Sequence, residues 1–258
     1  MRRIPVETTS GATLGRRSFV KLCASTAAVI SASPHLLAQA ARAPLRLYER
    51  VRLIDAGGKP LKATSLRAGD SLIFNYPYTT TPCFLLNLGK TITASVPLHT
   101  EAGAPYLWPG GVGTMQSLVA FSAICAHKMS HPAKAVSFIN YRHEAVSFRN
   151  AKEQVVTRAG VILCCSENSA YDPARGASVL GGPAKQPLCS ILLEHDSADD
   201  TLYALGSYGG EMFEPFFERF GPRLQIEWAT SDVRRTASAD VLAVPFDTYS
   251  RSQMMCGA

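Results

Sequence analysis

The sequence predicts an all-β fold for most of the chain, because short apolar runs alternate with turn-forming residues. Residues 45–78 show this pattern clearly: runs of Val, Ile, Leu, Phe and Tyr are separated by Gly-Gly, Lys-Pro and Ala-Gly-Asp. The chain has 258 residues, of which 47% are hydrophobic, and this suffices for one globular domain with extensions. Many short strands at this spacing are typical of an antiparallel β-sandwich or barrel.

Further strands and one helix are expected along the chain. The strand-like segments are 117–124, 135–140, 145–150, 160–165, 190–196, 201–207 and 223–230. A helix that packs on the sheet is expected over 209–221, where five large apolar residues share one face and Gly221 is placed to end it. Those five are Met212, Phe213, Phe216, Phe217 and Phe220. The C-terminal tail, residues 231–258, is weakly patterned, and we expect it to be extended or to wrap around the domain.

The first 40 residues have the pattern of a twin-arginine export signal. Arg16 and Arg17 are followed by Phe19, Lys21, a modest apolar run and a small-residue cleavage pattern ending at Ala40. The apolar run is shorter than the roughly 20 residues that a membrane helix needs. The sequence therefore predicts a periplasmic protein with a cleaved signal; an uncleaved signal would leave the protein associated with the membrane.

The basic charge of the chain belongs mostly to this leader. Of 26 basic and 20 acidic residues, the leader holds five basic and one acidic, which leaves 21 and 19 for the rest. A nearly balanced domain gives no electrostatic indication of a nucleic-acid partner.

Six cysteines lie outside the leader, which itself holds Cys23. They are Cys83, Cys125, Cys164, Cys165, Cys189 and Cys256. The vicinal pair Cys164 and Cys165 is unsuited to bonding with itself, and Cys256 is close to a terminus that we expect to be loose. The sequence therefore does not predict a dense disulfide framework.

Two loops carry residues that could hold metal. Cys125 and His127 follow the strand-like segment 117–124, and Cys164 and Cys165 follow another apolar run, with 36 residues between His127 and Cys164. Two such loops that close over one site can hold a [2Fe–2S] cluster, with thiolates on one iron and imidazoles on the other.

Residues from about 65 to 230 resemble a Rieske iron–sulfur domain. The first box is Cys125-Ala126-His127, the second is the run from Cys164 to Asp172, and a Gly-Gly-Pro-Ala loop at 181–184 follows. The resemblance implies a Rieske-like antiparallel β-sandwich or barrel over 44–230, with a cluster-binding loop subdomain and one short helix in its C-terminal half. It also implies that Ser169 and Tyr171 donate hydrogen bonds to the sulfurs, and that Gly182 and Pro183 belong to a loop that covers the cluster.

The sequence departs from the family in two places. Ser130 and Ser166 stand where the respiratory members have a disulfide between the loops, so the chain is similar to the branch that lacks this bridge. The second box also has no histidine. One alignment makes Cys164 the ligand and Glu167 the replacement of the histidine; the other makes them Cys165 and Asn168.

We prefer the second alignment, because one nucleotide change converts a His codon to an Asn codon. The candidate metal ligands are therefore Cys125, His127, Cys164, Cys165 and Asn168. A carboxamide oxygen is a poor ligand for ferric iron. Three outcomes stay open: a cluster completed by Glu167, by the second cysteine or by solvent; another metal such as zinc; or no metal.

Two functions follow from the resemblance. The favoured one is a one-electron transfer subunit that takes electrons from a quinol or an oxidoreductase and passes them to a periplasmic cytochrome c or to a large partner subunit. The alternative is a degenerate Rieske scaffold that has lost its cluster and serves in docking. Neither needs a catalytic residue. We expect His131 and His143 to be solvent-facing loop residues. The other cysteines and histidines are expected to be structural or incidental: Cys83, Cys189, His99 and His195.

Overall fold

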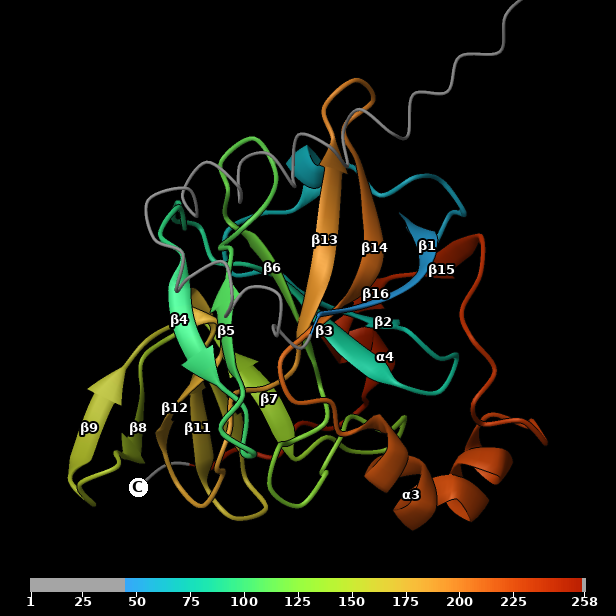
Figure 1. The fold of residues 1–258 in the computed structure, drawn as a ribbon. Helices are drawn as coiled ribbons and strands as arrows, with labels where there is room; N and C mark the ends of the chain where they lie inside the picture. Colours follow the sequence, from blue (N-terminus) through green and yellow to red (C-terminus); the bar gives the residue numbers. More distant parts are fainter. Residues whose placement is uncertain (1–44, 257–258) are drawn as a thin grey trace, which may run out of the picture. The chain divides into compact units, whose positions relative to one another are not determined.

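The computed structural model describes residues 45–256, and its largest element is an eight-stranded sheet (Figure 1). In spatial order the strands are β15 (Asp240–Leu242), β1 (Leu45–Ile54), β14 (Thr201–Tyr208), β13 (Ser190–Asp196), β6 (Leu118–Ser122), β3 (Pro82–Asn87), β2 (Ser71–Asn75) and β16 (Val244–Pro245). All neighbours are antiparallel except β1 and β15. Because β15 also lies near β2, the sheet is nearly closed, and the predicted all-β class is confirmed.

A second, smaller sheet carries the part of the chain between 139 and 181. It contains β12 (Ser178–Gly181), β11 (Ser169–Asp172), β10 (Val161–Cys164) and β7 (Ile139–Arg142). Two separate hairpins accompany it: β4 (Val96–His99) with β5 (Pro105–Trp108), and β8 (Val146–Arg149) with β9 (Val155–Arg158). The predicted strand-like segments at 117–124, 145–150, 160–165, 190–196 and 201–207 all contain a strand, whereas at 135–140 the strand begins only at residue 139.

One apolar core joins the two sheets. Phe84 and Phe121 of the large sheet belong to the same buried cluster as Ile139 and Ile162 of the small one. Every residue of β3 and of β6 is buried, which explains why these central strands read as continuous apolar runs and not as alternating ones. The shared core fixes the small sheet against the large one.

The helix is longer than predicted, and the strand expected at 223–230 is wrong. Helix α3 (Phe213–Glu227) continues through Gly221 and Pro222 instead of ending there. Gly221 does not take the left-handed conformation that ends many helices. Leu224 lies on the same apolar face as Phe213 and is buried with it, so packing continues the helix past the local stop signals.

His131 is buried, which contradicts the expected solvent-facing position. Its ring packs edge-on against Phe216 and Phe220 of α3, with centroid distances of 4.8 and 4.9 Å. Nδ1 lies 3.0 Å from the carbonyl of Met129, and burial lowers the pKa of the imidazole. His131 therefore fastens the first loop to the helix.

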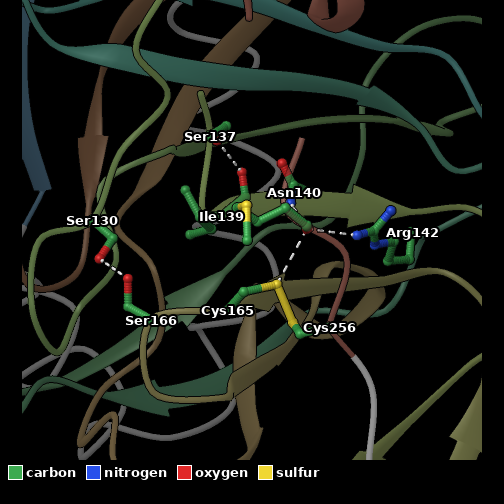
Figure 2. The surroundings of a disulfide bond; sticks show 9 residues. Ser130, Ser137, Ile139, Asn140, Arg142, Cys165, Ser166 and Cys256 are labelled. Atoms are coloured by element: carbon green, nitrogen blue, oxygen red, sulfur yellow. Dashed lines mark hydrogen bonds between the residues drawn. A yellow bond between two sulfur atoms is a disulfide. The ribbon is translucent and has the colours of Figure 1, made fainter. Parts of the chain in front are cut away.

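The C-terminal tail is integrated into the fold as far as Cys256. It supplies β15 and β16 to the large sheet and a single helical turn, α4 (Phe246–Tyr249). The carbonyl of Met254 then accepts hydrogen bonds from Asn140 (2.8 Å) and Arg142 (2.9 Å) beside β7 (Figure 2). Cys256, for which we expected a loose position, forms a disulfide with Cys165.

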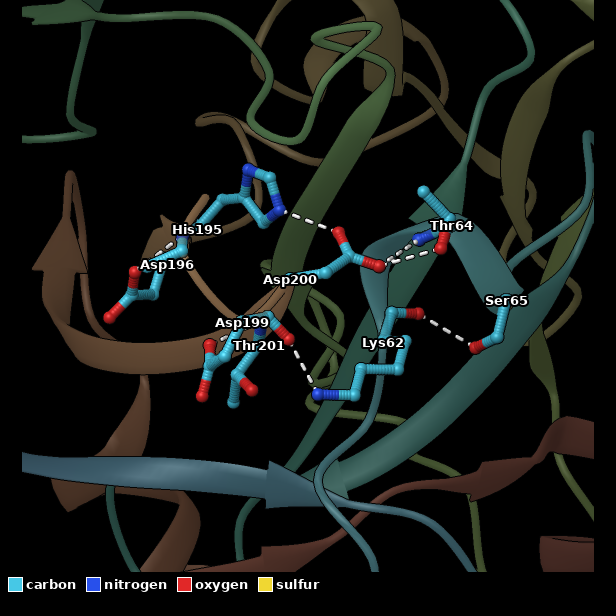
Figure 3. Close-up of polar contacts among 9 residues, drawn as sticks. Lys62, Thr64, Ser65, His195, Asp196, Asp199, Asp200 and Thr201 are labelled. Carbon is cyan, nitrogen blue, oxygen red and sulfur yellow. Dashed lines mark hydrogen bonds and ion pairs between the residues drawn. The ribbon is translucent and has the colours of Figure 1, made fainter.

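A polar network holds the turn between β13 and β14, at the C-terminal end of β13 (Figure 3). Asp200 accepts a hydrogen bond from the hydroxyl of Thr64 (2.6 Å) and lies 2.8 Å from Nε2 of His195. Lys62 donates to the carbonyl of Asp199 at 2.5 Å. This network gives His195 a structural role, as the sequence predicted.

Among residues 45–256 no helix has the length and apolar character needed to cross a membrane.

Candidate metal centre

The first predicted metal loop follows β6 directly. After the buried strand, the backbone turns so that the N–H of Cys125 donates to Ser130 (2.9 Å) and that of Met129 to Cys125 (3.0 Å). Met129 takes a positive φ of 58° within this turn. The tight turn buries Cys125 and leaves the His127 side chain 24% exposed.

The second loop connects β10 to β11. Cys164 and Ser169 face each other across the hairpin, so residues 165–168 form its turn. Asn168 has a φ of 59°, in the left-handed region where Asn is the commonest residue after Gly. Asn168 is exposed, and its presence is explained by this backbone conformation.

The two loops bring together the thiols of Cys125 and Cys164, both of which are free and 99% buried. A hydrogen bond from Cys164 lowers the pKa of Cys125, and the hydroxyl of Tyr171, 3.2 Å from its sulfur, acts in the same direction. The same pairing and the burial raise the pKa of Cys164. One proton shared between two buried sulfurs makes the first ionisation easy and the second difficult.

The serines at the positions of the respiratory-type disulfide also meet. Ser130 Oγ lies 2.6 Å from Ser166 Oγ, and this hydrogen bond links the two loops (Figure 2). The pair therefore occupies the place that the resemblance gives to a covalent bridge, with a weaker and reversible contact.

Glu167 approaches His127 across the mouth of the same site. Its Oε2 lies 3.4 Å from His127 Nδ1, while its Oε1 lies 3.2 Å from the ammonium of Lys128. His127 Nδ1 is buried and has no hydrogen-bond partner, so the two atoms are close without being aligned for a hydrogen bond.

Two glycines let a third segment pack closely on the second loop. A Cβ on Gly182 would clash with the carbonyl oxygen of Asn168 in the second loop, and one on Gly181 would clash with that of Arg149 at the end of β8. Gly182 also has a φ of 79°, which L side chains rarely adopt. Pro183, which follows, is exposed, and Ala184 is buried in the shared core. The predicted Gly-Gly-Pro-Ala loop therefore lies on the second box.

A buried ion pair fixes the end of β11, the strand that carries Ser169 and Tyr171. Asp172 has a 3% exposed side chain and lies 2.7 Å from the guanidinium of Arg158. Its other oxygen accepts from the N–H of Ala174 (3.1 Å) and caps the short 3-10 helix Pro173–Arg175. A paired and capped carboxylate of this kind holds Tyr171 in register beneath the first loop.

The preferred alignment of the second box does not match the geometry. Cys165, predicted as a candidate ligand, is bonded to Cys256, so its sulfur is not a free thiolate. Asn168 is the αL residue of the turn, and it is Glu167 that lies next to His127. The structure thus favours the alternative alignment, in which Cys164 and Glu167 occupy the ligand and histidine positions.

The donor set fits a [2Fe–2S] cluster as two pairs. Cys125 and Cys164 form a buried sulfur pair, and His127 and Glu167 form a nitrogen–oxygen pair nearer the surface. Ser169 Oγ is buried and has no hydrogen-bond partner. A cluster sulfur would supply the acceptor that this hydroxyl lacks. Within residues 45–256 no three His, Cys, Asp or Glu side chains converge on one point, so the structure has no preformed site for a single metal ion.

The order of the two boxes, the facing loops and the Tyr171–Cys125 contact match what the Rieske resemblance implies. In these features the chain is similar to Rieske proteins. It is 27% identical over 198 residues to the iodate reductase subunit IdrB of Denitromonas iodatirespirans, which covers 77% of this chain and 83% of that protein. The soluble domain of the Rieske protein II (soxF) from Sulfolobus acidocaldarius aligns with a TM-score of 0.44 and 24% identity, over 64% of this chain and 82% of that one. No family model matches the chain.

The remaining cysteines and two histidines named in the sequence analysis lie outside the candidate metal site. The thiols of Cys83 and Cys189 donate to the carbonyls of Tyr76 (3.0 Å) and Tyr208 (3.4 Å), and burial raises the pKa of both. His99 and His143 are exposed. The predicted export signal, residues 1–40, lies outside the described residues and stays a prediction.

The sequence offered Glu167 as the histidine replacement in the alignment that was not preferred. The signal that favours it is the turn, because an αL position before Ser169 suits Asn168. The Cys165–Cys256 disulfide had no comparable signal, because its two residues are 91 positions apart and the tail is weakly patterned.

Proposed function

We propose that this Rieske-like protein is the one-electron transfer subunit of an oxidoreductase. The observation that carries the proposal is the meeting of Cys125 and Cys164, from two distant loops, in a buried site where the Tyr171 hydroxyl contacts the Cys125 sulfur. When bound there, a [2Fe–2S] cluster would supply reversible one-electron chemistry. Cys125 and Cys164 would hold its inner iron, and His127 would hold the outer one.

The chain's own residues would supply the rest of the function. The shared core around Cys125 and Cys164 keeps water from the sulfur pair, and Tyr171 and Ser169 are placed to donate hydrogen bonds to sulfur. His127 and Lys128 stand at the solvent edge, with side chains 24% and 48% exposed. An electron would leave through this edge to a partner that docks over the two loops.

The proposed partner is a larger oxidoreductase subunit in the periplasm. A curated relative is a subunit of iodate reductase, which supports a role inside a multi-subunit redox enzyme. The Cys165–Cys256 disulfide supports an exported protein, because disulfides persist in oxidising compartments. The twin-arginine pattern of the first 40 residues supports the same location. A periplasmic cytochrome c is the proposed alternative acceptor.

The docking-only alternative rests on one departure, the missing histidine of the second box. A redox titration separates the two functions. We expect the purified chain to take up one electron per molecule reversibly and to reduce an oxidised cytochrome c. A colourless protein with no redox transition would favour the docking role.

We expect Tyr171→Phe to lower the reduction potential while the iron stays bound. With Cys125 bound to iron as a thiolate, the hydroxyl would donate to a sulfur that gains electron density on reduction, so its loss would remove stabilisation of the reduced state. A net hydrogen bond of about 1 kcal/mol corresponds to roughly 40 mV for one electron. Tyr141→Phe, which changes another largely buried tyrosine of the same core, serves as the control, and an equal shift in both variants would argue against a specific contact.

A further inference from the structure

The second loop presents one side chain that can act as a ligand beside His127. Cys165 is bonded to Cys256, Ser166 is paired with Ser130, and Asn168 is the αL residue of the turn. Glu167 remains, and its Oε2 lies 3.4 Å from His127 Nδ1. The hairpin therefore aims a carboxylate at the place where the resemblance implies a second imidazole.

We propose that Glu167 is the fourth ligand of the cluster and shares the outer iron with His127. This inference rests on the proposed function, because it assumes that the cluster is bound. Carboxylate oxygen is a good ligand for iron, unlike the carboxamide of Asn168. The outer iron would thus have one nitrogen and one oxygen from the protein, while the inner iron keeps two thiolates.

The surroundings of Glu167 hold its carboxylate in place for this role. The ammonium of Lys128 lies 3.2 Å from Oε1, which leaves Oε2 as the oxygen that faces His127. Metal-bound carboxylates are commonly held in this way by a partner of the second oxygen. His127 Nδ1 is buried and unpartnered, so both candidate atoms are available to a metal that lies between them.

A surface ion pair is the competing explanation of this geometry. Glu167 is 44% exposed, and an ion pair with Lys128 and His127 at such a position contributes little to stability. Under that explanation Glu167 would be dispensable for iron binding. Under ours its removal opens a coordination position on the outer iron.

The consequence for the redox chemistry is a lower potential than two imidazoles would give. A carboxylate adds a negative charge to the outer iron and stabilises its ferric form, whereas imidazole is neutral. Replacing Glu167 by histidine would restore a neutral pair and should raise the potential.

The test measures nitrogen coupling and iron content in the protein expressed with cluster assembly. Electron–nuclear double resonance of the reduced wild-type protein should detect one strongly coupled histidine nitrogen, and Glu167→His should gain a second. Glu167→Ala should retain about tenfold less iron, or give a changed spectrum with solvent as ligand. Glu144→Ala, which removes an exposed carboxylate from the turn between β7 and β8, is the matched control and should behave as wild type.

The outcomes distinguish the two proposals. An iron-containing wild type with two coupled nitrogens, or a Glu167→Ala variant with unchanged iron and spectrum, would overturn the ligand assignment and leave electron transfer standing. A wild type without iron would overturn the proposed function itself, and the assignment with it. Circular dichroism of each variant shows whether the fold is kept, and the wild-type nitrogen count needs no variant at all.

Discussion

Replacing Cys164 by serine is expected to abolish iron binding, whereas replacing its neighbour Cys165 is expected to leave the iron bound. Cys164 is a free, buried thiol paired with Cys125, so its loss would remove a thiolate from the proposed inner iron. Cys165 is committed to a disulfide and has no sulfur to offer. Iron and acid-labile sulfide assays on the two variants, expressed side by side, measure the difference.

The two vicinal cysteines serve as controls for each other, because the substitutions are at adjacent positions of the chain. Iron in Cys164→Ser at the wild-type level would contradict the site that we describe. Iron lost from Cys165→Ser with the fold intact would return the ligand role to Cys165 and support the other alignment of the second box.

We expect Cys256→Ser to lower the thermal midpoint of the protein by about 10 °C. The disulfide closes a sequence separation of 91 residues, and removing a bridge over such a loop costs about 4 kcal/mol. For a domain of this size, each kcal/mol changes the midpoint by roughly 2–4 °C. Cys165 is next to Ser166 in the second loop. The disulfide therefore holds this loop covalently, whereas the Ser130–Ser166 hydrogen bond holds it only weakly.

The comparison of three variants tests whether the bond itself is responsible. Cys165→Ser, Cys256→Ser and the double variant should all have the same midpoint, since each removes one and the same bond. A midpoint of Cys256→Ser equal to that of the wild type, or a double variant that loses the sum of both single effects, would contradict a stabilising disulfide.

The sequence predicted the strands well where the apolar pattern was local. β13 and β14 lie within one residue of the predicted segments, because alternation and turn residues mark both ends. The end of the helix was misplaced, because Gly221 and Pro222 are local stop signals that the burial of Leu224 overrides. Packing of this kind depends on residues far away in the sequence.

The sequence predicted both loops of the site and left two alignments of the second box, of which the structure favours the one with Cys164 and Glu167. Cys125 and His127 are separated by one residue, so the sequence alone places both side chains on the same loop. The choice between Glu167 and Asn168 depends on the φ of one residue and on the approach of His127 from another loop. The disulfide of Cys165 depends on where the tail places Cys256, and no local sequence pattern specifies this position.

The central claim is that this chain holds a [2Fe–2S] cluster between Cys125, Cys164 and the His127 side of the site. The most direct measurement is the iron content of the anaerobically purified wild-type protein, taken together with the electron paramagnetic resonance spectrum after dithionite reduction. The account predicts about two irons per chain and a spectrum with the low average g of clusters that have non-sulfur ligands on one iron. A folded, colourless, iron-free protein would contradict it.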